Sequence, residues 1–354
     1  MRTRTRRKGT ALELQPAFGL WRRYDPGAAP YRFRARTVAE AGKWQAATRR
    51  AMDELVGFQD APPVPPAPRV LQTVDKGDYV RQKILIRTTA HTAMPVYVLT
   101  PKRAPRPLPV VLAFHGHGYG VNDIVGLWED GSERDAPSGY HKDFAVALCR
   151  RGFLVAAPEI SCFGERQSDF SPLAPLGSPV PTTCAHTAFL AFHLGGTAVG
   201  LRVLDGKRLV DYLATRKDAD ISRLGAMGIS GGGMHTFFST CLDTRIRACV
   251  VSGYYSTFRG SILAMHHCPC NFIPHLHRFG EMYDLVGLIA PRPMLVEAAD
   301  HDNIFPAPAV KEGVRRARKV YKVFGAPGNV QTDFFEGRHE ISGAKAYDFL
   351  VRVL

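Results

Sequence analysis

The spacing of apolar positions changes near residue 60, and this change predicts two kinds of structure. Up to that point apolar residues recur at intervals of three and four over residues 38–55, as on one face of a helix. Thr37 and Glu40 match a capping box at its start, with Glu40 placed to accept from the Thr37 amide. Residues 1–60 are therefore expected to form a basic arm and an N-terminal helix.

Beyond a Pro-rich linker, expected over residues 61–74, short and nearly continuous apolar runs alternate with helical patterns. Such runs are typical of strands buried on both faces of a parallel sheet. The alternation predicts an α/β fold over residues 75–354, with a mostly parallel central sheet and helices on both faces. The expected strands are 79–89, 94–100, 110–114, 153–157, 224–227, 248–251, 294–298 and 332–335, and the expected helices are 143–151, 200–215, 232–242 and 307–324.

The chain has a formal net charge of +14, which raises the question of nucleic-acid binding. The first 50 residues hold 13 basic and three acidic side chains, so the excess lies mostly in the arm. That distribution favours a solvated tail or a contact between subunits of a homo-oligomer, and no nucleic-acid partner is expected. No apolar run approaches the roughly 18–20 residues that span a bilayer, so no membrane association is expected.

Seven cysteines in an irregular spacing, with no apolar signal segment after the basic start, predict reduced thiols and a cytoplasmic location. Cys268 and Cys270 lie in a segment rich in possible zinc ligands, together with His266, His267, His275 and His277. One residue, Pro269, separates the two cysteines, whereas zinc motifs use two or more. We therefore expect no metal and no cofactor. His235, on the expected helix 232–242, is expected to be a packed helix residue.

The strongest local motif is Gly228-Ile229-Ser230-Gly231-Gly232, which fits G-x-S-x-G between an expected strand and an expected helix. The turn is tight, so a side chain at Gly228 or Gly232 would collide with neighbouring backbone. It would expose the Ser230 hydroxyl as a nucleophile. The Gly231 amide, at the start of the helix, is a candidate oxyanion donor.

A nucleophilic serine needs a base and an acid that orients the base. Asp302 follows the expected strand 294–298 and His339 follows the strand 332–335, in the order Ser, Asp, His that α/β-hydrolases use. Asp300 is the rival acid; His301 is a weaker rival base because it lies on the acid's own loop. The Gly-rich stretch after residue 114 makes the His117 amide the second candidate oxyanion donor.

Together these features make the chain resemble the α/β-hydrolase superfamily, and more closely bacterial esterases of the acetyl xylan esterase and dienelactone-hydrolase-like group. The resemblance covers roughly residues 75–354 and includes His115-Gly116-His117-Gly118, Phe163-Gly164-Glu165-Arg166 and Ala290-Pro291-Arg292-Pro293. It implies an α/β-hydrolase fold that hydrolyses small-molecule carboxylic esters without a metal or organic cofactor. Dienelactone hydrolases proper use a cysteine nucleophile, whereas this chain has Ser230.

The expected function is hydrolysis of short-acyl, acetyl-like esters through an acyl-enzyme intermediate on Ser230. One alternative is a serine peptidase of the prolyl-oligopeptidase type. Those enzymes usually carry a propeller domain, and the 74 residues ahead of the sheet are too few to form one. The other is a catalytically silent binding protein on the same fold, which an intact Ser230, Asp302 and His339 set disfavours.

Residues 161–200 are too many for an ordinary connection and are expected to form a lid insertion, with Cys184 and His186 among its wall residues. Bulky aromatic side chains in the lid, and a second wall after Tyr254, predict a small closed acyl pocket; those in the lid are Phe163, Phe170, Phe189 and Phe192.

Acetyl and similarly short nitrophenyl esters should be cleaved much faster than esters of eight or more carbons. Steric exclusion in a closed pocket can outweigh the ~1–3 kcal/mol gained for each added apolar group. A series of nitrophenyl esters from two to twelve carbons measures this preference. An optimum at eight carbons or beyond would contradict the expected closed pocket.

Overall fold

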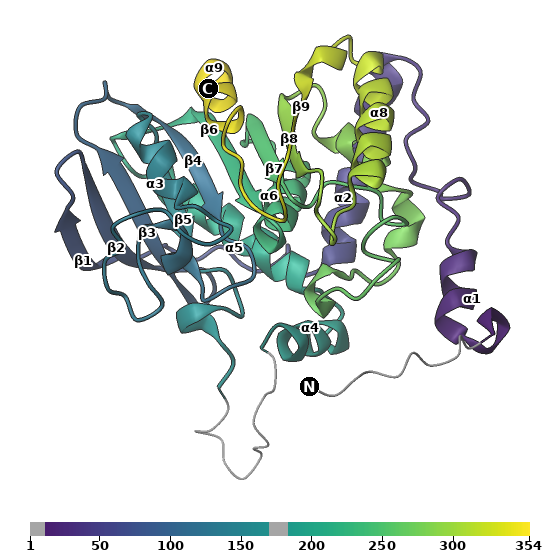
Figure 1. The fold of residues 1–354 in the computed structure, drawn as a ribbon, viewed down its shortest axis with the longest axis horizontal. Coiled ribbons are helices and arrows are strands. Elements are labelled where there is room, and N and C mark those ends of the chain that lie inside the picture. Colours follow the sequence, from purple (N-terminus) through teal and green to yellow (C-terminus); the bar gives the residue numbers. More distant parts are fainter. Residues whose placement is uncertain (1–10, 170–182) are drawn as a thin grey trace.

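The computed structural model describes residues 11–169 and 183–354, whose centre is a nine-stranded sheet (Figure 1). The strand order is β1-β2-β3-β5-β4-β6-β7-β8-β9. The pairs among β1, β2, β3 and β5 are antiparallel, and every pair from β5 through β4 to β9 is parallel. The strands are β1 (Arg69–Asp75), β2 (Tyr79–Arg87), β3 (Ala93–Pro101), β4 (Leu108–Phe114), β5 (Leu154–Pro158), β6 (Ala219–Ile229), β7 (Ala248–Ser252), β8 (Met294–Ala299) and β9 (Val330–Phe335).

The predicted α/β fold with a mostly parallel sheet is confirmed, and β2 to β9 lie where the apolar runs placed them. β1 was not predicted, and it occupies the second half of the expected linker 61–74. It is an edge strand, antiparallel to β2, and all its residues but one are exposed. Because neither face of β1 is buried, its sequence carries no apolar run to mark it.

Helices cover both faces of the sheet, as predicted. α3 (Phe144–Arg150) and α9 (Ala346–Val353) pack on one face. The other face carries α2 (Val38–Val56), α5 (Ala198–Leu213), α6 (Gly231–Leu242) and α8 (Ala307–Val323). β4 and β7 between these layers are almost entirely buried, which explains their continuous apolar sequence.

The predicted lid is only partly described, since residues 170–182 lie outside the described residues. Its second half forms α4 (Thr183–His193), which lies in the lower part of Figure 1 and packs against α5. No single helix in the described part of the chain is long and apolar enough to cross a membrane, although the bent pair α4 and α5 together passes that test by length and composition.

The arm, described from residue 11 onward, lies against the body of the same chain. It contains α1 (Pro16–Arg23), and the Tyr24 hydroxyl donates to the Gly280 carbonyl at 2.7 Å. The Tyr31 ring stacks on Phe279 with centroids 4.8 Å apart. A contact of the arm with a second subunit stays a prediction.

The capping box expected at the start of α2 is half formed. The Thr37 hydroxyl accepts from the Glu40 amide at 3.2 Å, as expected. The Glu40 carboxylate, however, accepts from the Arg36 amide at 2.8 Å, one residue earlier than predicted. α2 then buries Met52 and Val56 in a cluster shared with α5 and α6, so the helical extension belongs to the same core as the α/β domain.

Candidate active site

Ser230 lies in a sharp turn between β6 and α6 and has a backbone conformation that side chains rarely adopt. Its φ is +58° and its ψ is −122°. The turn is held by two hydrogen bonds, since the Ser230 amide donates to the Ser252 carbonyl at 3.1 Å and the Met234 amide donates to the Ser230 carbonyl at 2.9 Å. A strained serine at a strand-to-helix turn is the geometry of a nucleophile elbow.

The glycines that flank Ser230 are required by close backbone packing, as the sequence predicted. A Cβ on Gly232 would overlap the Phe114 carbonyl of β4, and a Cβ on Gly228 would lie 2.5 Å from the Gly232 carbonyl oxygen. Real Cβ atoms essentially never come that close to backbone. The elbow can therefore pack directly against the end of β4 only with glycine at both positions.

Asp302 and His339 come together in the loops that follow the carboxyl ends of β8 and β9. Nδ1 of His339 donates to the Asp302 carboxylate at 2.7 Å. The other carboxylate oxygen accepts from the amides of Ile304 and Phe305 at 2.8 and 3.0 Å. Burial opposes ionisation, but the bonds from His339 and the two amides hold the pKa of Asp302 below its usual value. Asp302 is thus a carboxylate that can orient the imidazole.

The two rival residues lie elsewhere. Asp300 is exposed and forms an ion pair with Lys311 at 3.7 Å. His301 is also exposed, and its amide donates to the Gly337 carbonyl at 3.0 Å. Neither side chain contributes to the Asp302–His339 pair, so the geometry selects Asp302 and His339 among the alternatives that the sequence left open.

The His339 ring lies close to the elbow that carries Ser230. Nε2 is buried and has no hydrogen-bond partner among the described residues. The ring lies near those of Tyr140 and Phe305, with centroid distances of 5.6 and 5.9 Å. A Cβ on Gly253 would meet both the His339 ring, at 3.0 Å, and the side chain of Ile229, at 3.3 Å. The imidazole therefore lies beside the residue that precedes Ser230.

The loop after β4 packs on the elbow, as expected for an oxyanion loop. A Cβ on Gly116 would lie 3.1 Å from Cβ of Ser230, and a Cβ on Gly231 would lie 2.9 Å from Nδ1 of His117. Gly231 is the first residue of α6, where amides have no partner within the helix. The structure thus places the loop that carries His117 against Ser230 and Gly231, and it pairs Asp302 with His339, whose ring lies beside Ile229.

Comparison with known proteins assigns the chain to a family. A model of the Abhydrolase family matches residues 28–345. The chain belongs to this family. It is similar to the candidate hydrolase YtaP of Bacillus subtilis (strain 168), with 26% identity over 291 residues that cover 80% of this chain and 89% of YtaP.

Two solved structures share the fold of this Abhydrolase family member. A candidate acetyl xylan esterase from Bacteroides fragilis NCTC 9343 has a TM-score of 0.73 and 21% identity, covering 94% of this chain and 84% of its own. A glucuronoyl esterase from Solibacter usitatus has a TM-score of 0.61 and 18% identity, covering 88% of this chain and 91% of its own. These likenesses establish an α/β-hydrolase fold.

A second histidine–aspartate pair, which the sequence analysis missed, supports the loop after β4. The Gly116 amide donates to Nε2 of His141 at 2.7 Å, so Nδ1 of His141 donates to the Asp123 carboxylate, 2.7 Å away. His141 is fully buried, and burial lowers its pKa despite the bond to Asp123. It is held as a neutral acceptor. Asp123 also pairs with the buried Arg134 at 3.4 Å.

Two buried glutamates were also missed, and each ties a site loop to the sheet. Glu297 accepts from the Ser252 hydroxyl at 2.7 Å and from the Gly343 amide at 2.7 Å, and so joins the end of β7 to the chain after His339. Glu159 accepts from the Val121 amide at 3.1 Å in the loop after β4. A glutamate within an apolar strand, as in Met294–Ala299, is the sequence signal for such a role.

The side chain of His117 has partners that its backbone role did not predict. Its ring meets three thiols, those of Cys184, Cys268 and Cys270. The four ligand atoms come from three separate segments, so spacing within the segment 266–277 could not reveal them. His235 is buried and stacks on Phe114 with centroids 3.7 Å apart, as expected for a packed helix residue.

The aromatic residues expected to form the acyl pocket do not all lie near the site. Phe163 packs edge-on against His117 with centroids 5.1 Å apart. Phe189 is 60% exposed on α4, and Phe170 lies outside the described residues. Phe305, after β8, stacks beside His339 and was not expected as a wall.

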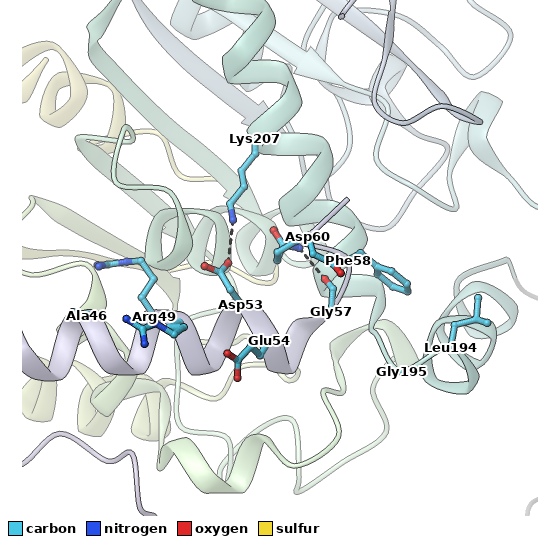
Figure 2. Close-up of a pocket in the computed structure, with 12 residues that line it drawn as sticks. Ala46, Arg49, Asp53, Glu54, Gly57, Phe58, Asp60, Leu194, Gly195 and Lys207 are labelled. Atoms are coloured by element: carbon cyan, nitrogen blue, oxygen red, sulfur yellow. Dashed lines mark hydrogen bonds and ion pairs between the residues drawn. The ribbon is translucent and has the colours of Figure 1, made fainter. Parts of the chain in front are cut away.

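A cavity of about 920 Å³ lies away from all these residues, between the C-terminal half of α2 and the junction of α4 and α5 (Figure 2). Lys207 points to Asp53 across it, and their side chains pair at 3.0 Å. None of the five predicted site residues lines this cavity. It is a hollow beside the helical extension, separate from the candidate active site.

Replacement of His141 by glutamine should change how stability depends on pH. As pH falls below ~6.5, His141 becomes protonated in the unfolded chain but not in the folded chain. The free energy of unfolding of the wild type therefore falls by up to about 1.4 kcal/mol per pH unit. His141→Gln should be less stable at pH 7.5 by about 1–3 kcal/mol, and the gap should narrow toward pH 5. Urea unfolding across this range measures both curves.

The matched control is His91→Gln, at an exposed histidine, which should follow the wild-type curve at every pH. Parallel curves for wild type and His141→Gln would contradict the assignment of a buried neutral imidazole.

Proposed function

We propose that this Abhydrolase family member hydrolyses carboxylic esters with short acyl groups through an acyl-enzyme on Ser230. The observation that carries the proposal is the hydrogen bond of 2.7 Å between Asp302 and His339, beside the strained elbow of Ser230. These residues follow the carboxyl ends of three parallel strands, β6, β8 and β9, and so lie at the same end of the sheet. A serine, a base and an orienting acid are the elements that acyl transfer needs.

In the proposed reaction the Ser230 hydroxyl attacks the acyl carbon and Nε2 of His339 removes its proton. The Gly231 and His117 amides donate to the oxyanion that forms, which stabilises charge where it develops. His339 then protonates the leaving alcohol, while Asp302 keeps the imidazole in the required tautomer and stabilises its charged form. A water molecule activated by His339 releases the acid and restores Ser230.

The proposed preference for short acyl groups is supported by the aromatic surroundings of the site. Tyr140 and Phe305 flank the imidazole, and Phe163 packs on the oxyanion loop at His117. The structural relatives carry the names of an acetyl xylan esterase and a glucuronoyl esterase, both of which are carboxylic ester hydrolases by name. A small-molecule ester is therefore the proposed substrate.

A cytoplasmic location is part of the same proposal. All seven cysteines are free thiols in the structure, and six of them are buried, which suits a reducing compartment.

Ser230→Ala should abolish ester hydrolysis and leave the fold intact. Loss of a triad nucleophile lowers kcat by several orders of magnitude, on the order of 10³-fold or more. A fluorophosphonate probe should label the wild type at Ser230, which peptide mapping identifies, and should leave the variant unlabelled. Labelling also separates an active hydrolase from a silent binding protein.

Ser222→Ala is the matched control, because Ser222 is an exposed serine on the same strand, β6, and should keep both labelling and rate. If purified Ser230→Ala kept more than about a tenth of the wild-type turnover, Ser230 could not be the nucleophile.

Asp302→Asn should be severe and Asp300→Asn mild. An asparagine at residue 302 cannot accept from Nδ1 of His339 in the same way and favours the wrong tautomer, which in a comparable triad costs about 10⁴-fold in kcat. Asp300→Asn removes only an exposed ion pair with Lys311. Steady-state kinetics with a nitrophenyl acetate substrate compare the two variants. Equal and large losses would leave the acid unassigned, and a large loss at Asp300 alone would reverse the assignment.

A further inference from the structure

Four potential metal ligands meet beside the oxyanion loop. A ring nitrogen of His117 and the sulfurs of Cys184, Cys268 and Cys270 all lie within 4.8 Å of one another. Nε2 of His117 is 3.6 Å from Sγ of Cys270 and 4.0 Å from Sγ of Cys184. The four residues come from the loop after β4, the first turn of α4, and the short helical turn η5 (Pro269–Asn271) with the residue before it.

These distances are close to those of a tetrahedral zinc site. With Zn–S of about 2.3 Å and Zn–N of about 2.0 Å, tetrahedral geometry separates two sulfurs by about 3.8 Å and a sulfur from a nitrogen by about 3.5 Å. Since all four atoms lie within 4.8 Å of one another, reaching these values needs a contraction of no more than about 1.3 Å between any two of them. Three thiolates and one imidazole are a ligand set typical of structural zinc.

The charge around the cluster gives an independent reason to place a metal there. Arg202 on α5 is 1% exposed, and none of its hydrogen-bond partners in the described part of the chain is a carboxylate. Its guanidinium contacts Sγ of Cys270 and of Cys184, each at 3.6 Å, and the Ser161 carbonyl at 3.4 Å. Its Nε is buried and has no partner among the described residues.

A buried cation without a counter-charge is strongly unfavourable. If the three cysteines were neutral thiols, Arg202 would be such a cation. One Zn²⁺ bound by three thiolates and a neutral imidazole carries a net charge of −1, which balances the single positive charge of Arg202. The balance accounts for an arginine that faces sulfur and no carboxylate.

We propose that His117, Cys184, Cys268 and Cys270 bind one zinc ion. Binding forms three Zn–S bonds and one Zn–N bond and releases three thiol protons to solvent, with no change of oxidation state. All four positions of the metal belong to the protein, so the ion is structural and activates no water. It fastens α4 and residues 268–270 to the loop that carries the His117 amide.

The proposed site replaces the expectation that this chain has no metal. That expectation considered only the possible ligands within the segment 266–277, and not the two that the fold adds from elsewhere, His117 and Cys184. The zinc proposal does not depend on the proposed ester hydrolysis, because it rests on the ligand atoms and Arg202 alone.

Elemental analysis and cobalt substitution on the full chain test the proposal. Protein purified under reducing conditions should hold one zinc per chain. After removal of zinc by a chelator, addition of Co²⁺ should produce the visible absorption of tetrahedral cobalt and a thiolate-to-cobalt charge-transfer band. Zinc should then displace cobalt and raise the melting temperature, because the metal binds the folded state.

Cys268→Ser should weaken zinc binding at least about tenfold, since it removes one of four ligands from a half-buried position. Cys162→Ala is the matched control, because its thiol lies beside that of Cys184 but outside the ligand set, and it should keep zinc.

Three results would overturn the proposal. Reduced protein that takes up neither zinc nor cobalt is the first, and protein purified without reductant that holds a disulfide among these cysteines in place of the metal is the second. The third is a Cys162→Ala variant that loses zinc while the Cys268→Ser variant keeps it. If Cys268→Ser fails to fold, the cobalt spectrum of the wild-type chain still decides.

Discussion

The close approach of the elbow to the end of β4 is the constraint on which the rest of the site depends. Gly232 touches the Phe114 carbonyl so tightly that no side chain fits between them. This contact places the amide end of α6 against the loop after β4, and with it the two candidate oxyanion donors. It also forces Ser230 into a positive φ, a strained conformation that two neighbouring hydrogen bonds maintain.

Buried polar pairs hold the loops that surround this contact. His141 and Asp123 fix the Gly116 amide, and Glu297 joins the end of β7 to the chain after His339. Burying a polar group is costly unless it is hydrogen-bonded, so each of these side chains favours the loop arrangement that keeps its bonds. Asp302 is built in the same way, because it accepts from two amides as well as from the imidazole.

The thiol cluster extends this support to the lid. His117 contributes its amide to the candidate oxyanion hole and its ring to the cluster with Cys184, so the two sites share one residue. A zinc ion at this point would fasten α4, which packs against α5, to the loop after β4 as well. The buried charge of Arg202 then becomes part of the same unit.

The local pattern of the chain was sufficient for the fold and for the chemical groups of the site. Strands buried on both faces have continuous apolar sequences, and the elbow must carry glycines at fixed spacing, so β4, β6 and Ser230 could be predicted from adjacent residues. The order of Asp302 and His339 after their strands followed from the same pattern. β1 was missed because an exposed edge strand leaves no apolar signal.

The tertiary structure alone decided which distant side chains meet. It separated Asp302 from Asp300, because only the fold shows which carboxylate faces His339. It also joined Cys184 to Cys268 and His117 across more than sixty residues of chain, and it set Arg202 against sulfur. Ligand sets, charge balance and buried polar pairs depend on distances in space, and no spacing along the sequence encodes them.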